Sequence, residues 1–118
     1  MEEKNRFESG SLRMKPVGDC AVLIECGDRI CEEVNRRVTG LAAIIGEAHL
    51  PGLVETVPAF TSLLVSYDPL ITDYRGVCKA LEGLAAQERE IGKTAREVEI
   101  PVCYGGEFGE DLPFVAKH

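Results

Sequence analysis

The stretch Leu53-Val-Glu-Thr-Val-Pro-Ala-Phe-Thr-Ser-Leu-Leu-Val-Ser-Tyr-Asp-Pro69 decides the fold of this chain. Its first part alternates apolar and polar side chains up to Val57, which is typical of a half-buried strand. Residues 62–67 form a second, more apolar run, and Asp68-Pro69 ends it. Because only a few residues separate the two runs, they predict an antiparallel pair of strands, with Pro58 confined to an edge or a turn.

The segment before this pair predicts a strand followed by a helix. Residues 20–26 are an apolar run of strand length, and Gly27-Asp28 breaks it. Asp28 is a candidate cap for the helix that follows. That helix has one apolar face, made by residues three or four positions apart: Ile30, Val34, Val38, Leu41 and Ile45. Pro51-Gly52 ends it.

The segment after the pair predicts a second helix and a last strand. Thr72 or Asp73 is suited to cap the helix, whose apolar positions run from Tyr74 to Ala85. Residues 96–102 then alternate, with Val98, Ile100 and Val102 on one side. This alternation predicts a fourth strand with one solvated face.

The predicted order is therefore β-α-β-β-α-β. This is the ferredoxin-like split βαβ pattern, an α+β sandwich in which two helices cover one face of a four-stranded antiparallel sheet. We expect a flexible polar lead-in at residues 1–15 and an N-terminal α/β domain at 16–104. Residues 105–118 begin a connection and a helix too short to be stable alone. We expect its packing partner in a domain beyond His118.

The bulk composition restricts the class of protein. The chain has 118 residues and a net charge of −7, which disfavours nucleic-acid and anionic membrane surfaces as partners. No apolar run approaches the roughly 20 residues of a membrane-spanning helix, and the first ten residues lack the apolar core of a signal peptide. Five cysteines without a Cys-x-x-Cys pair predict reduced thiols in the cytoplasm and no metal site.

Two segments supply candidate ligand-binding or partner-binding residues. Tyr104, Gly105, Gly106 and Glu107 form either a ligand-facing loop or, the interpretation we favour, a tight turn that redirects the chain into the next helix. The Pro58-Ala-Phe60 bend is a candidate for presenting an edge or face to a partner.

The sequence predicts no catalytic residue. The acidic side chains Glu107, Glu110 and Asp111 fit a solvated helix start better than acid–base chemistry or metal binding. No serine lies in a Gly-x-Ser-x-Gly elbow, and no histidine is close in sequence to a candidate nucleophile.

Three segments resemble one bacterial family. Residues 17–28 are similar to its opening GD-x-A-hydrophobic-E-x-G motif, residues 55–69 to its VPAYxSLLVxYDP segment, and residues 99–112 to its IPVCYGGEFGPDL signature. This family is the B subunit of bacterial ATP-dependent 5-oxoprolinase, also called allophanate hydrolase subunit 1, and it includes the Kip inhibitor of the sporulation histidine kinase. The resemblance covers residues 16–118. The chain departs from the pattern at Phe60, often Tyr, and at Glu110, often Pro.

The resemblance implies a function for a larger protein. Members pair an N-terminal α/β domain with a C-terminal cyclophilin-like barrel and, with A and C subunits, open 5-oxoproline to glutamate at the expense of ATP. The expected partners are those subunits and the C-terminal domain. ATP is used by the whole complex, and no cofactor is expected in this part, which alone is not expected to catalyse. The alternatives are a module that inhibits a histidine kinase by binding its dimerisation domain, and a subunit for urea or allophanate degradation.

Overall fold

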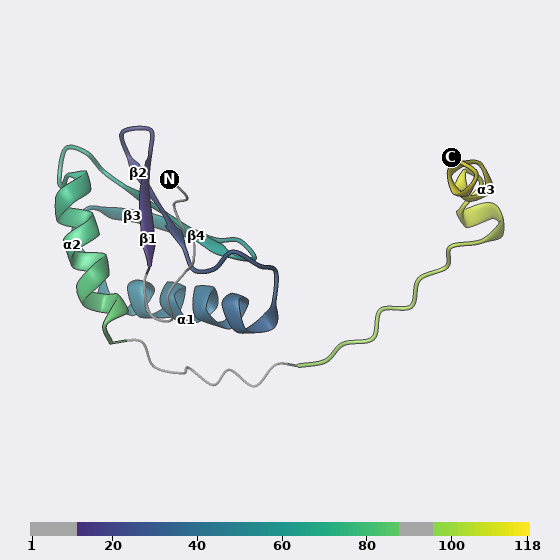
Figure 1. Cartoon of the computed structure of the whole chain (residues 1–118), viewed down its shortest axis with the longest axis horizontal. Coiled ribbons are helices and arrows are strands. Elements are labelled where there is room, and N and C mark those ends of the chain that lie inside the picture. Colours follow the sequence, from purple (N-terminus) through teal and green to yellow (C-terminus); the bar gives the residue numbers. More distant parts are fainter. Residues whose placement is uncertain (1–11, 88–95) are drawn as a thin grey trace, which may run out of the picture.

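The computed structural model describes residues 12–87 and 96–118. Its elements in chain order are β1 (Arg13–Val17), β2 (Ala21–Glu25), α1 (Glu32–Ala48), β3 (Leu53–Pro58), β4 (Ser62–Tyr67), α2 (Tyr74–Ala85), the 3-10 turn η1 (Gly106–Phe108) and α3 (Leu112–Ala116). The four strands form one antiparallel sheet in the order β1-β2-β4-β3 (Figure 1).

The α+β class is confirmed, because a four-stranded antiparallel sheet packs against two main helices. The central antiparallel pair is also confirmed, with Val57 opposite Leu64 and Pro58 opposite Leu63. Pro58 lies on β3, an edge strand, where its missing N–H donor leaves no gap in the ladder.

The predicted fourth strand at 96–102 is wrong. The place beside β2 is taken by β1, which lies partly in the predicted lead-in and begins before residue 16. The observed order is therefore β-β-α-β-β-α. The physical reason is local: Gly18, at φ +62°, lets the chain turn directly from β1 into β2. Such a short hairpin costs less loop-closure entropy than pairing with a strand near the far end of the chain.

The composition of β1 concealed it in the sequence. Met14 and Leu12 pack against the core, while Arg13 and Lys15 point to the open face. Both basic side chains reach Glu25 on β2, at 3.7 Å from Arg13 Nε and 2.9 Å from Lys15 Nζ. The strand therefore has only a weak apolar side, and Pro16 fits because β1 is an edge strand.

The core lies between one face of the sheet and both helices. Val22 pairs with Val65 and Ile24 with Leu63, so these four side chains line the same face. The helices cover that face with fully or almost fully buried residues: Val38, Leu41 and Ile45 from α1, and Val77 and Leu81 from α2. The spacing predicted for both helices is thus confirmed in their central turns.

The helix starts differ from each other. Asp73 caps α2 as predicted, since its Oδ1 accepts a hydrogen bond from the Gly76 N–H at 2.7 Å. Asp28 does not cap α1, which begins at Glu32 after an extended Cys31. Ile30 consequently stays outside the helix and is exposed, contrary to the predicted apolar face.

Residues 96–118 stand apart from this packed body. Each of them is exposed except Gly109, which is half-buried. Figure 1 shows this segment running away from the sheet, with α3 at its far end. Within the described residues, no helix is both long and apolar enough to cross a membrane.

Candidate functional site

The predicted bend at Pro58 and Phe60 is the tip of the hairpin between β3 and β4. The Ala59 N–H donates to the Ser62 carbonyl at 2.8 Å, which closes the turn. Pro58 ends β3, and Phe60 follows within the turn with half of its surface exposed (50%). An aromatic side chain is therefore displayed at one end of the sheet.

Two further hydrogen bonds hold this hairpin tip, residues 58–61, against the rest of the domain. The Asn35 side-chain amide of α1 donates to the Phe60 carbonyl at 3.2 Å. The Cys26 N–H donates to the Thr61 carbonyl at 2.9 Å. Because the backbone on both sides of the ring is bonded, the tip is pre-organised, and a partner loses less conformational entropy when it binds such a surface.

Asn35 is a residue that sequence reasoning missed. It lies among polar residues in the first turn of α1, and no motif marks it. Its contact joins positions 25 residues apart, so only the folded structure reveals it.

The other predicted residues lie in a tight turn of the exposed tail. Gly106 has φ +62°, and its carbonyl accepts the Gly109 N–H at 3.2 Å. A Cβ on Gly109 would collide with the Tyr104 carbonyl oxygen, so the turn requires glycine there. The chain then enters α3 through the Leu112 N–H bond to the Gly109 carbonyl. The segment is therefore a turn that leads into a helix, and a ligand-binding or partner-binding role for its residues stays a prediction.

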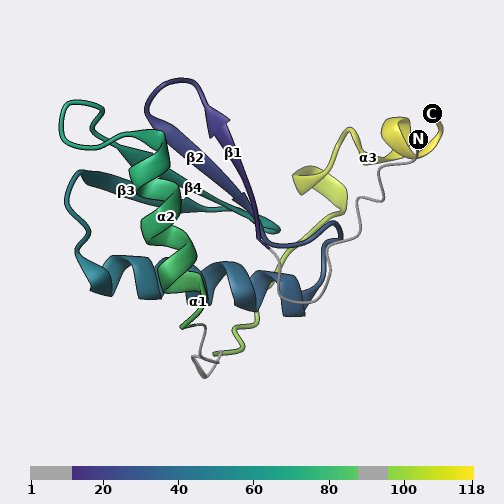
Figure 2. The same cartoon turned by 60° about the vertical axis from the view of Figure 1, so that its left-hand side comes forward.

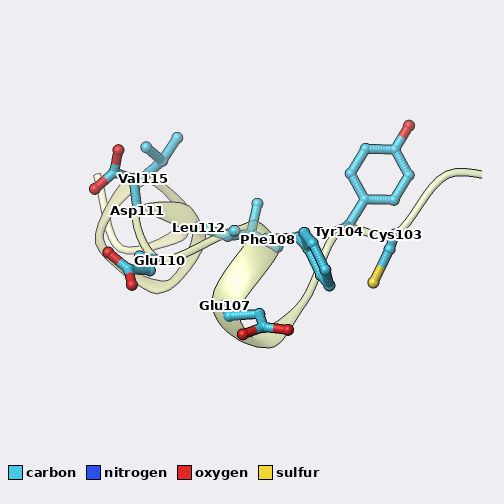
Figure 3. A pocket seen from close by; sticks show the side chains of 9 residues that line it. Cys103, Tyr104, Glu107, Phe108, Glu110, Asp111, Leu112 and Val115 are labelled. Atoms are coloured by element: carbon cyan, nitrogen blue, oxygen red, sulfur yellow. The ribbon is translucent and has the colours of Figure 1, made fainter.

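The tail turn forms only an open hollow. Tyr104, Glu107, Phe108, Asp111 and Val115 are among the side chains that line it (Figure 3). The carboxylates of Glu107, Glu110 and Asp111 stand apart in this view and do not converge on a point. Among the described residues, no group of three or more His, Cys, Asp or Glu side chains is placed to hold a metal ion.

The structure does not bring the two predicted sites together. The hairpin tip belongs to the packed body, whereas the tail turn lies on the segment that runs away from it (Figure 1). The residues Pro58 and Phe60 are therefore one candidate surface, and the residues from Tyr104 to Glu107 are another.

Two tyrosines with shifted pKa lie at the opposite end of the sheet from the hairpin tip. Burial raises the pKa of Tyr67, and Coulomb interactions with Cys20 and Asp19 act in the same direction. A hydrogen bond with the Cys78 side chain raises the pKa of Tyr74, with burial as the second cause. Both shifts favour the neutral phenol, which suits a packing role.

Comparison with known families gives a match over residues 12–118, to the family described as carboxyltransferase domain, subdomain C and D. Among curated proteins, the B subunit of 5-oxoprolinase from Bacillus subtilis is 41% identical over 116 residues, covering 89% of this chain and 48% of that protein. This chain spans about half the length of that relative.

Two solved structures are similar to this one. An uncharacterised protein of Pyrococcus horikoshii is 51% identical, with a TM-score of 0.62 over 89% of this chain and 48% of that one. The N-terminal domain of the histidine kinase inhibitor KipI from Bacillus subtilis is 33% identical, with a TM-score of 0.56. The match covers 73% of this chain and 95% of that domain.

Proposed function

This chain belongs to the family described as carboxyltransferase domain, subdomain C and D, and we propose that it is the N-terminal part of a 5-oxoprolinase B subunit. The observation that carries the proposal is its 41% identity to a protein of that name over 89% of the chain. In this role it acts with A and C subunits to convert 5-oxoproline to glutamate at the expense of ATP. Since ATP is a cytoplasmic metabolite, the cytoplasm is the proposed location.

The proposed contribution of this part is binding. The hairpin tip supports it, because a pre-organised and half-exposed aromatic ring is the kind of anchor that dominates protein interfaces. ATP and 5-oxoproline are assigned to the whole complex, and no residue of this chain is assigned to either of them.

The tail is proposed to begin a second folding unit. Val98, Ile100 and Val102 alternate as in a strand, yet all three are exposed. An isolated strand or a five-residue helix gains too little from its own contacts to persist. A neighbouring unit that covers these side chains supplies the missing contacts.

The test combines the protein with its cognate A and C subunits, ATP and 5-oxoproline, and measures glutamate. We expect release that requires all three proteins. Equal release in the absence of this protein contradicts the proposal.

A pair of variants examines the hairpin tip in a titration of the protein with the same partner subunits. Phe60→Ala is expected to weaken the affinity for them by about tenfold or more, because it removes an anchor. Val54→Ala is the matched control, since Val54 is an exposed apolar residue of β3 outside the tip. Equal losses for the two variants contradict the role of Phe60.

Inhibition of a histidine kinase is the second candidate. The observation in its favour is the match to 95% of the KipI N-terminal domain. Autophosphorylation of a sporulation-type kinase, followed with labelled ATP, separates the two candidates. Inhibition at a one-to-one ratio supports the second candidate, and an unchanged rate excludes it.

A further inference from the structure

The turn between β4 and α2 carries the most exposed apolar side chain of the packed body. Leu70 is 94% exposed and its neighbour Ile71 is 63% exposed. We call Pro69, Leu70 and Ile71 the apolar knob. Figure 2 shows this connection projecting at the upper left, away from the sheet. Single exposed apolar residues are common on protein surfaces, so exposure alone assigns no role to the knob.

The knob is held in one conformation by its own turn. The Leu70 N–H donates to Asp68 Oδ1 at 2.9 Å, and the Ile71 and Thr72 N–H groups both donate to the Asp68 carbonyl at 3.1 Å. Pro69 fixes its own φ angle. The exposed leucine is thus presented by a bonded turn.

The loop before β3, which contains Gly52, packs against the turn that carries the knob. The Asp68 N–H donates to the Gly52 carbonyl at 2.7 Å. Gly52 has φ +85°, and a Cβ there would lie 2.8 Å from Thr72 Cγ2 and 3.0 Å from Ile71 Cγ2. The loop therefore passes so close to the turn that only glycine fits. Leu70 itself has no such neighbour and extends into solvent.

The charges around the knob are mostly negative. The turns at this end of the sheet comprise residues 18–20, 49–52 and 68–75. They carry three carboxylates against one guanidinium, Arg75: Asp19, Asp68 and Asp73. The Tyr67 N–H bond to the Cys20 carbonyl, 2.8 Å, brings the β1–β2 turn to this end. The knob is an apolar projection with an acidic collar.

We propose that the apolar knob is a docking element for a partner subunit of the same enzyme, which receives Leu70 in an apolar pocket rimmed by lysine and arginine. The inference rests on the proposed function. A bonded turn reduces the entropy lost on binding, and the collar selects a basic partner and repels acidic ones. The net charge of −7 also disfavours a second copy of this chain as the occupant.

The test measures binding of the protein to its purified A and C subunits by titration calorimetry. Leu70→Ser is expected to weaken the affinity by about tenfold or more, because it removes the anchor. Val54→Ser is the matched control, since Val54 is 68% exposed on β3 and belongs neither to the knob nor to the hairpin tip. A loss for Leu70→Ser no larger than that for Val54→Ser overturns the proposal.

A salt series examines the collar in the same titration. Wild-type affinity is expected to fall between about 0.05 and 0.5 M salt, and Asp19→Asn to make this fall shallower. An affinity that does not change with salt contradicts the proposal that lysine and arginine surround the partner's pocket. If Leu70→Ser keeps both binding and glutamate release, the role of the knob is refuted and the proposed function is not. If the wild-type protein neither binds nor supports release, both are refuted.

Discussion

Residues 12–87 and residues 96–118 both carry apolar side chains at regular spacing, but the two regions bury them to opposite extents. In the first region, Ile24 lies at 0% exposure between β1 and β4. In the second, Ile100 lies between Val98 and Val102 at alternate positions and is 77% exposed. Both segments can present an apolar side, but only the first is covered. An apolar pattern therefore predicts that a segment can form a strand, but it does not identify the strand or sheet with which the segment pairs.

Matched isoleucine substitutions should give the largest difference between the two regions. Ile24→Ala removes a fully buried side chain and is expected to lower the free energy of unfolding by about 2–5 kcal/mol. Ile100→Ala is expected to change it by less than about 0.5 kcal/mol. Urea denaturation followed by circular dichroism measures both. Similar losses for the two variants would break the distinction between body and tail.

Two glycines with the same backbone angle allow a second comparison. Gly18 and Gly106 both have φ +62°, and a Cβ on either would meet open space. Gly18→Ala is expected to cost about 1–2 kcal/mol, because alanine is strained in this conformation and the β1–β2 turn is part of the cooperative fold. Gly106→Ala should leave the unfolding midpoint unchanged. A shifted midpoint for Gly106→Ala would show that the tail turn unfolds together with the body.

Loss of the ion pairs of Glu25 should change the free energy of unfolding by a smaller amount. Glu25 is the partner of both basic side chains on β1, so Glu25→Gln is expected to cost about 0.2–1 kcal/mol, less at high salt. Glu97→Gln in the tail is the control and should have no effect on unfolding. If molar salt does not reduce the cost of Glu25→Gln, the attachment of β1 is not electrostatic.

The smallest effect is confined to alkaline pH. Because burial raises the pKa of Tyr67, the folded state keeps this proton where the unfolded chain has lost it. The stabilisation is present below pH about 10 and is lost as the pH rises further through the folded-state pKa. Tyr67→Phe should therefore show a shallower decline of stability at strongly alkaline pH than wild type. Parallel declines in thermal melts would exclude Tyr67 as a cause.

The sequence was sufficient for the elements whose partners are near or strongly patterned. The hairpin of β3 and β4 followed from two apolar runs joined by a bend, and α2 followed from its spacing and the Asp73 cap. It was insufficient for β1, whose outward side carries Arg13 and Lys15 and whose core-facing side offers Met14, with Leu12 just before the strand. Competition between β1 and residues 96–102 for the same sheet edge depends on the cost of loop closure, which the hydrophobic pattern does not contain.

The candidate sites divided in the same way. Phe60 was predicted from a bend that only local residues determine. The contact that positions its backbone comes from Asn35 on a helix, and a polar residue in a polar helical turn carries no signal for it. The apolar knob lies between Asp68-Pro69, which ends the strand, and the Asp73 cap, and no sequence pattern predicts that Leu70 and Ile71 stay exposed. Their exposure and the bracing by Gly52 are properties of packing.

The central claim is that residues 12–87 fold as a unit without residues 96–118. The most direct test is urea unfolding of a chain that ends at Gln87, compared with the chain that ends at His118. We predict the same midpoint, and a smaller signal only from the lost tail. A lower midpoint that corresponds to a loss of more than about 1 kcal/mol in the free energy of unfolding would contradict the claim. It would show that the tail contributes to the stability of the body.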